Sequence, residues 1–468
     1  MKAAVVVPGI MATRLILPAA ATGDADEEVW PPTPLETQFG YRRIDKLRDH
    51  RLVPGRIVDQ VLCFPFYRLL VSQLGELGYA ADGAERRLVE FPYDWRRDLF
   101  DTADRLADRL DALAGDGAED ISLVAHSMGG LVARLVLESG AFDDRPFFPA
   151  VRRLVALAVP HLGAPLALAR IFGVDGALGI RPEDFARLAA DRDFPSGYQL
   201  IPAPGEAAVW NLASRDAAPL DVYDPAIAGP LGMDPHLVAR AAAVHEVLGT
   251  YRQPEHVRYV FFGGTGHRTV TRVNVSLTAG APADHRRTVV TRTPDAGDGT
   301  VPIWSALPRP AQRQLVVNEH ATVFDGIPFK RVFFRLMGGD AGPPLEALPG
   351  AAEAGPHLAL TIDGPVQRAR RAIELTIAVV EPAAEFALAD VPGRVGRIDG
   401  ELVIDRLDED GRRALPEAHA RIPIRYDGPP VERLTLLLPA IDEPGLFRMR
   451  FHGTPPATGP VPLAVSEA

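Results

Sequence analysis

Ser127 lies where a strand pattern turns abruptly into a helix pattern. The apolar run ISLVA (121–125) ends at HSMGG (126–130), and LVARLVLES continues with helical spacing. A turn of this kind presents the serine hydroxyl, and its flanking positions must be small so that strand and helix can approach. The usual spacing is G-x-S-x-G; here Ala125 takes the first small position and Gly129 keeps the last. The segment therefore predicts a nucleophilic serine.

Asp298 and His320 follow later strand patterns, in the order that a serine nucleophile of this kind needs. A serine hydroxyl is a poor nucleophile until an imidazole takes its proton and a carboxylate fixes the imidazole tautomer. Asp298 lies in the glycine-flanked loop DAGDGTVP, and His320 directly follows QLVVN. Alone, the first could be a turn residue and the second a packed or surface histidine. Together, in the order Ser, acid, His, they favour a triad, with Asp295 and Asp325 as alternative acids.

The reaction also needs backbone donors for a developing oxyanion. One is the amide of Met128, directly after the serine, and the other is predicted at Met11, in the turn that follows the first strand. A proline-glycine turn there could equally be one that only ends the strand, but its place after the first strand favours the oxyanion role. His126 is predicted to point away from the serine and shape the pocket. His161, after the next strand, is predicted to line the acyl site.

Strand and helix patterns alternate through the first two-thirds of the chain, which indicates βαβ units and a mostly parallel sheet. The predicted strands are 3–7, 86–91, 121–125, 151–160, 256–264 and 314–318, and the predicted helices are 66–79, 99–115, 131–139 and 328–338. A hairpin is expected at 269–293, after the strand 256–264.

The composition and the hydrophobic pattern of the sequence change at about residue 339. Residues 339–356 are rich in Gly, Pro and Ala and predict a linker, and 357–468 hold short alternating strand patterns that predict an all-β, sandwich-like accessory domain. Residues 1–338 then form one catalytic domain, with insertions at about 12–60 and 163–255 that are expected to act as a lid or cap. The β domain could dock on lipid, bind a partner protein or brace the catalytic domain. Its lack of a clear aromatic or basic patch favours the last two.

The composition limits the classes of function. A net charge of −11 argues against a nucleic-acid partner. The single cysteine, Cys63, excludes an internal disulfide and favours a reducing compartment. Pro8-Gly9 interrupts the apolar amino terminus, which predicts a core strand rather than a signal peptide, and no run approaches the ~18 apolar residues of a membrane span. We therefore expect a cytoplasmic protein that touches membranes, if at all, from that side.

Several motifs resemble one known family when they are taken in order. VVVPGIM, FPYDWRRD, AHSMGG, PHLGAP, YQLIP, GDGTVP and NEHATVF occur in the order seen in lecithin:cholesterol acyltransferase-like proteins, which include phospholipid:diacylglycerol acyltransferases and related phospholipases. The resemblance covers about residues 1–335 and implies an α/β-hydrolase fold, a lid and an acyl-serine intermediate on a lipid ester. It also implies that Asp94 and Trp95 of PYDWR lie near the acyl pocket. The disulfides of secreted members cannot form in this chain.

Three hypotheses about function follow. The first is a serine hydrolase or acyltransferase acting on lipid acyl esters, and the second is a carboxylesterase or thioesterase acting on small soluble esters. The third is a non-catalytic interaction protein that works through its β domain, against which Ser127, Asp298 and His320 argue. We expect no metal and no organic cofactor, because the serine chemistry requires neither.

Overall fold

The computed structural model describes residues 1–468 except 20–24, 59–66, 215–218, 279–280, 309–311, 340–355, 363, 365, 382–390, 409–412, 458–459 and 468. The chain forms two compact units. The first comprises Met1–Pro31, Arg42–Asp59 and Phe66–Asp325, and the second comprises Pro32–Tyr41, Gln60–Pro65 and Gly326–Ala468. The first unit thus ends before the boundary predicted at residue 338. The predicted linker, apart from its two end residues, lies outside the described part of the chain, as does Cys63.

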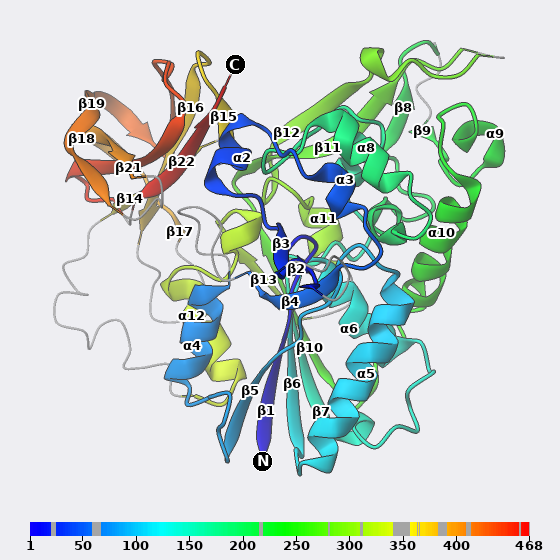
Figure 1. The fold of residues 1–468 in the computed structure, drawn as a ribbon. Helices are drawn as coiled ribbons and strands as arrows, with labels where there is room; N and C mark the ends of the chain where they lie inside the picture. The colour runs from blue at the N-terminus through cyan, green and yellow to red at the C-terminus, as the bar shows by residue number, and fades with distance from the viewer. Residues whose placement is uncertain are drawn as a thin grey trace. The chain divides into compact units, whose positions relative to one another are not determined.

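A six-stranded parallel sheet forms the centre of the first unit (Figure 1), as the alternating pattern predicts. Its strand order is β13-β10-β7-β6-β1-β5, and every neighbouring pair is parallel. The middle strands are apolar along most of their length because both faces of the sheet are covered. This is the central sheet of an α/β-hydrolase. Its strands are β1 (Lys2–Val7), β5 (Arg86–Glu90), β6 (Asp120–His126), β7 (Val151–Leu157), β10 (Arg258–Gly264) and β13 (Gln312–Val316).

Three helices connect these strands at the positions that the sequence predicts: α4 (Arg68–Glu76), α5 (Leu99–Gly115) and α6 (Met128–Glu138). The side chain of Asp98 caps α5, whose apolar stripe is buried, and α5 packs on α6. Every residue of α6 is buried, so the helix that carries the serine turn is held on all sides. Within the described ranges, no helix is both long and apolar enough to span a membrane.

The early excursion contains a small antiparallel sheet that the sequence pattern does not predict. Its strands, in the order β3-β2-β4, are β2 (Thr13–Leu17), β3 (Glu27–Trp30) and β4 (Val53–Ile57). The short helix α3 (Ile44–Leu47) contacts β3. Helix α2 (Pro34–Phe39) belongs to the second unit. Figure 1 shows β2, β3 and β4 beyond the carboxyl ends of the parallel strands, the edge at which α/β proteins carry their sites.

The long insert and the predicted hairpin combine into a second sheet, which with its helices is called the cap here. The hairpin is confirmed as β11 (His267–Val275) and β12 (Val289–Gly297), and β8 (Val209–Asn211) and β9 (Pro219–Leu220) extend it in the order β12-β11-β8-β9. Apolar residues of α7, α10 and β11 share one buried cluster. The helices of this region are α7 (Pro165–Ile171), α8 (Pro182–Ala189), η2 (Pro195–Leu200), α9 (Pro225–Ala228), α10 (Pro235–Gly249) and η3 (His285–Arg287).

The remaining short helices of the first unit are η1 (Phe148–Ala150), α11 (Ile303–Ala306) and η4 (His320–Thr322). The carboxyl-terminal segment of the second unit begins with α12 (Ile327–Leu336) and continues as a pair of β-sheets around one apolar core, in line with the predicted sandwich-like domain. One sheet has the order β14-β16-β17 with β20 also on β16, and the other has the order β15-β22-β21-β18-β19. The strands are β14 (His357–Ile362), β15 (Val366–Arg368), β16 (Ile373–Glu381), β17 (Val391–Pro392), β18 (Val395–Leu407), β19 (Ala414–Val431), β20 (Arg433–Leu438), β21 (Gly445–Thr454) and β22 (Val461–Ser466).

Candidate active site

Ser127 occupies a strained turn between β6 and α6. Its backbone angles are φ 52° and ψ −129°, a conformation that costs a non-glycine residue energy and that the packed surroundings must maintain. The turn is possible because Gly129 lies against β1: a Cβ there would be 2.4 Å from the carbonyl oxygens of both Val7 and Pro8. The requirement for a small residue is therefore strict at Gly129, whereas Ala125 already carries a Cβ on the strand side.

A substitution at this close approach has a definite expected result. Gly129→Ala places a methyl group against two backbone carbonyls, which cannot move aside as a flexible side chain could. We expect about 1–3 kcal/mol of lost unfolding free energy, together with a loss of activity as Ser127 shifts. Urea unfolding and ester hydrolysis measure the two effects. The matched control is Gly75→Ala on α4, where a Cβ meets nothing within 4 Å. Equal stability of the two variants would contradict this account of the turn.

The structure brings together the three side chains that the sequence selects. His320 Nε2 lies 2.8 Å from Ser127 Oγ, and His320 Nδ1 lies 2.8 Å from Asp298 Oδ2. Ser127 follows β6, Asp298 follows β12 and His320 opens η4 after β13. Segments almost two hundred residues apart therefore meet at the carboxyl end of the sheet. With a proton on Nδ1, the imidazole can accept the serine proton at Nε2.

Asp298 is held so that one carboxylate oxygen faces the imidazole. Its Oδ1 accepts hydrogen bonds from the amides of Thr300 (2.9 Å) and Val301 (2.7 Å), which leaves Oδ2 for His320. The amide of His320 donates to the carbonyl oxygen of Asp298 at 2.9 Å, so backbone and side chain are both tied. Asp298 is buried, whereas the alternative acids Asp295 and Asp325 are exposed. The geometry favours Asp298 as the partner of the imidazole.

The loop after β1 lies directly against the serine. A Cβ on Gly9 would be 2.8 Å from the Cβ of Ser127, so only glycine allows this approach. Met11 adopts a positive φ of 64° in the same loop. Among the described residues, the amides of Met11 and Met128 have no hydrogen-bond acceptor. The role of these two amides as oxyanion donors remains a prediction.

Four buried aromatic side chains, called the aromatic frame here, fix this loop: Trp30, Tyr67, Tyr93 and Trp95. The Tyr93 hydroxyl donates to the Pro8 carbonyl (2.7 Å), and the Gly9 amide donates to the Tyr67 hydroxyl (2.8 Å).

The two indoles act in the same way. The Trp30 and Trp95 N–H groups donate to the carbonyls of Met11 (2.6 Å) and Thr13 (3.2 Å). Buried Trp side chains find hydrogen-bond partners in this manner, and here both acceptors are backbone carbonyls of the segment from Met11 to Thr13. Sequence reasoning misses Trp30, Tyr67 and Tyr93; the only local signal was aromatic content next to the proline-rich motifs.

Asp94 and Trp95, selected as substrate-binding residues, lie in this supporting structure. Asp94 forms a two-pronged ion pair with Arg96, with nitrogen–oxygen distances of 2.7–2.8 Å, and both side chains are almost fully buried. Arg96 in turn donates to the carbonyls of Leu47 (2.6 Å) and Asp49 (2.9 Å), which holds the α3 segment. Trp95 packs edge-on against Trp30, with ring centroids 5.4 Å apart. Contact of either residue with a substrate remains a prediction.

The two histidines near the serine differ in their surroundings. The His126 ring faces the His320 ring, with centroids 4.9 Å apart, and burial, with a smaller effect of His320, lowers the pKa of His126 to about 3. The His161 ring packs at a tilt against the Phe261 ring, with centroids 4.2 Å apart, and its Nδ1 lies 3.2 Å from Arg134 Nη1. Burial holds the pKa of His161 well below its usual value. Both imidazoles are therefore neutral, and the predicted place of His161 on the acyl site remains a prediction.

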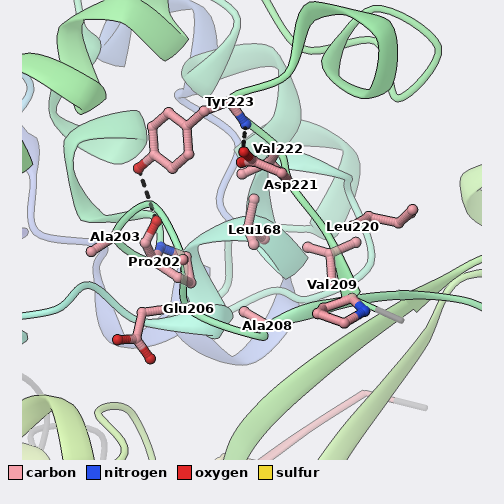
Figure 2. Close-up of a pocket in the computed structure, with 12 residues that line it drawn as sticks. Leu168, Pro202, Ala203, Glu206, Ala208, Val209, Leu220, Asp221, Val222 and Tyr223 are labelled. Atoms are coloured by element: carbon pink, nitrogen blue, oxygen red, sulfur yellow. Dashed lines mark hydrogen bonds between the residues drawn. The ribbon is translucent and has the colours of Figure 1, made fainter. Parts of the chain in front are cut away.

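A pocket lies in the cap (Figure 2). Leu168, Val209 and Leu220 give it an apolar wall, and the Tyr223 hydroxyl donates to the Pro202 carbonyl beside it. Burial raises the pKa of Glu206, which also lines the pocket. No member of the Ser127, Asp298 and His320 set is among its lining residues, so the pocket is a feature of the cap. Within the described ranges, no three His, Cys, Asp or Glu side chains gather closely enough to hold a metal ion.

Comparison with known proteins gives one family match. Residues 54–227 match the family model for lecithin:cholesterol acyltransferase, a span that contains FPYDWRRD and the serine turn but neither Asp298 nor His320. No curated protein matches the chain.

Several solved structures are similar at low identity. A chain of the Tle4–Tli4 complex is 13% identical, covering 69% of this chain and 95% of that chain with a TM-score of 0.47. The mature lipase BlEst2 of Bacillus licheniformis is 13% identical (71% and 91% covered, TM-score 0.34), and phospholipase PlaB of Legionella pneumophila is 11% identical (100% and 92% covered, TM-score 0.29). At these identities and scores the likenesses do not bear on activity.

The family match contains the sheet strands β5, β6 and β7, the serine turn and the PYDWR segment. The chain carries the central sheet of an α/β-hydrolase around them. This protein therefore has an α/β-hydrolase fold, and its residues 54–227 are similar to the lecithin:cholesterol acyltransferase family.

Proposed function

We propose that this protein is a serine hydrolase or acyltransferase that acts on lipid acyl esters through an acyl-serine intermediate. The observation that carries the proposal is the pair of 2.8 Å contacts joining Ser127 Oγ to His320 and His320 to Asp298. A serine hydroxyl so connected, on a strained turn at the carboxyl edge of the sheet, has the arrangement of an activated nucleophile.

The reaction takes two steps. Ser127 Oγ attacks the ester carbonyl carbon while its proton moves to His320 Nε2, and the amides of Met11 and Met128 bind the oxyanion. The ester C–O bond then breaks, and His320 returns the proton to the departing alcohol. Water or an acceptor alcohol next attacks the acyl-serine and gives its proton to His320. The acyl product leaves, and the proton returns to Ser127. Asp298 keeps the imidazole oriented throughout.

The lipid class of the substrate rests on the family. Residues 54–227 match the family model for lecithin:cholesterol acyltransferase, and lecithin is a phospholipid. In the first predicted lid region, 12–60, the strands β2, β3 and β4 lie beyond the carboxyl edge of the sheet, and in the second, 163–255, the described helices belong to the cap. We infer that these elements would cover a long acyl chain. A carboxylesterase or thioesterase acting on small soluble esters is the alternative, because the same three residues would serve it.

Product analysis tests the substrate class. The protein is incubated with phospholipid vesicles, with and without an added long-chain alcohol, and the lipids are analysed by mass spectrometry. We expect free fatty acid and lysophospholipid, and a new ester of the alcohol if the site admits an acceptor. Activity on short soluble esters with no lipid product would contradict the lipid proposal and favour the esterase. The Ser127→Ala protein is the control for carried-over activity.

The second unit is proposed to brace the catalytic unit or to bind a protein partner. Its two sheets enclose their own apolar core, which is the property of a domain that can fold independently. The expected cytoplasmic location, and contact with a membrane surface, remain predictions.

A further inference from the structure

The loop that follows β1 (residues 8–12) is called the oxyanion loop here. A chain of hydrogen bonds runs from this loop to the backbone of His320 through two side chains that the proposed reaction does not otherwise use. The Gly9 amide donates to Tyr67 Oη at 2.8 Å, and Tyr67 Oη lies 2.6 Å from His126 Nδ1. His126 Nε2 lies 2.9 Å from the carbonyl oxygen of His320. All four residues belong to the first unit.

The direction of each hydrogen bond follows from the groups involved. Tyr67 Oη accepts from the Gly9 amide, so its own hydrogen is available to donate to Nδ1 of His126. Nδ1 is then an acceptor, which places the imidazole hydrogen on Nε2, where it donates to the His320 carbonyl. Burial keeps the pKa of Tyr67 well above its usual value, so the phenol stays protonated.

The same chain of hydrogen bonds explains why His126 does not destabilise the protonated form of His320. His320 becomes positively charged when it takes the serine proton, and the His126 ring lies only 4.9 Å away. A charged His126 would repel that cation. Tyr67 donates to the one nitrogen that could take a proton, and Phe324 packs edge-on against the ring at 5.8 Å, so His126 stays neutral.

We propose that Tyr67 and His126 are positioning residues that couple the oxyanion loop to the catalytic histidine, so that both are held in register with Ser127. The inference rests on the proposed function. The amide of His320 is already fixed on Asp298, and the His126 bond fixes its carbonyl. One end of this chain of hydrogen bonds thus fixes the backbone of His320, the acid–base residue, and the other end fixes the loop that carries the Met11 amide.

The test compares Tyr67→Phe, His126→Leu, His126→Gln and the double variant Tyr67→Phe/His126→Leu with the wild type. We expect Tyr67→Phe and His126→Leu each to lower kcat by about 10- to 100-fold with KM changed by less than about threefold, because misplacement acts on the transition state. The double variant should lose about as much as one single variant, since either change breaks the same chain. Gln presents an acceptor and a donor on one carbon, so His126→Gln should recover most of the rate.

Tyr79→Phe is the matched control. Tyr79 is buried in the same unit, and within the described ranges its hydroxyl has no hydrogen-bond partner, so its loss should leave kcat unchanged. Thermal unfolding, and active-site titration with a fluorophosphonate, report the folded and competent fraction of each variant, so a fall in kcat per competent site is not a folding defect.

The outcomes separate the two proposals. Wild-type protein that a fluorophosphonate labels, with Tyr67→Phe labelled and turning over at the same rate, overturns the coupling and leaves the serine mechanism standing. Multiplied losses in the double variant, or a His126→Gln variant no better than His126→Leu, overturn it as well. Wild-type protein that is neither labelled nor active overturns the serine mechanism, and the coupling fails with it.

Discussion

Ser127→Ala is expected to lower kcat for ester hydrolysis by about 10⁵-fold or more while the protein stays folded. The substitution removes only the hydroxyl, and the turn remains possible because Gly9 and Gly129 keep their close approaches. KM should change little, because the hydroxyl contributes to bond formation and not to the binding of the acyl chain. Steady-state hydrolysis of a chromogenic ester, together with thermal unfolding, measures both properties.

The control for this prediction is Ser122→Ala on the same strand. Ser122 is also fully buried in β6, and its hydroxyl accepts a hydrogen bond from Arg153 at 2.8 Å, away from His320. We expect that variant to keep its kcat and to lose some stability. If Ser127→Ala retained more than about a hundredth of the wild-type rate, another nucleophile would have to be sought.

Asp298→Asn is expected to lower kcat by about 10⁴-fold through the wrong imidazole tautomer. The amides of Thr300 and Val301 donate to Oδ1, so the asparagine oxygen must face them and its NH₂ group must face His320 Nδ1. Nδ1 then becomes an acceptor, and the hydrogen moves to Nε2, where it blocks removal of the serine proton. The measurement is kcat across pH, with unfolding as the check on structure.

Asp295→Asn and Asp325→Asn are the matched controls, since both side chains are exposed and neither is the residue that pairs with His320 Nδ1. Both controls should keep near wild-type kcat. A large loss in either control, with Asp298→Asn unaffected, would move the acid role to that residue.

The serine turn, the acid and the histidine could be selected from the sequence because each has a local signature. Ser127 is bracketed by a change of periodicity from strand to helix, and Asp298 lies in a glycine-flanked loop. The central sheet was equally accessible, because strands buried on both faces read as continuous apolar runs. Chain order then linked the three residues without any knowledge of distance.

The aromatic frame could not be found in the same way. Tyr67 meets His126 from a position 59 residues earlier, and the hydrogen bonds of Trp30 and Tyr93 go to loop backbone, which leaves no pattern in the side chains. The substrate role given to Asp94 came from resemblance alone, and its carboxylate proves to hold Arg96.

The excursion and the cap were harder for another reason. The strands β2, β3 and β4 hold only 5, 4 and 5 residues, with charged residues in each and a proline in β4, and β8 and β9 hold only 3 and 2 residues. Segments so short acquire their conformation from pairing rather than from their own periodicity: β8 pairs with β11, β9 pairs with β8, and β3 and β4 both pair with β2.

The central claim, that Ser127 is the nucleophile, is tested most directly by covalent labelling with a fluorophosphonate followed by peptide mass spectrometry. Attack by Ser127 Oγ on phosphorus expels fluoride and leaves a stable adduct on the peptide that contains AHSMGG. We expect one adduct on Ser127 in the wild type, none in Ser127→Ala, and slow labelling in Asp298→Asn. Wild-type protein without an adduct, or an adduct that persists in Ser127→Ala, would contradict it.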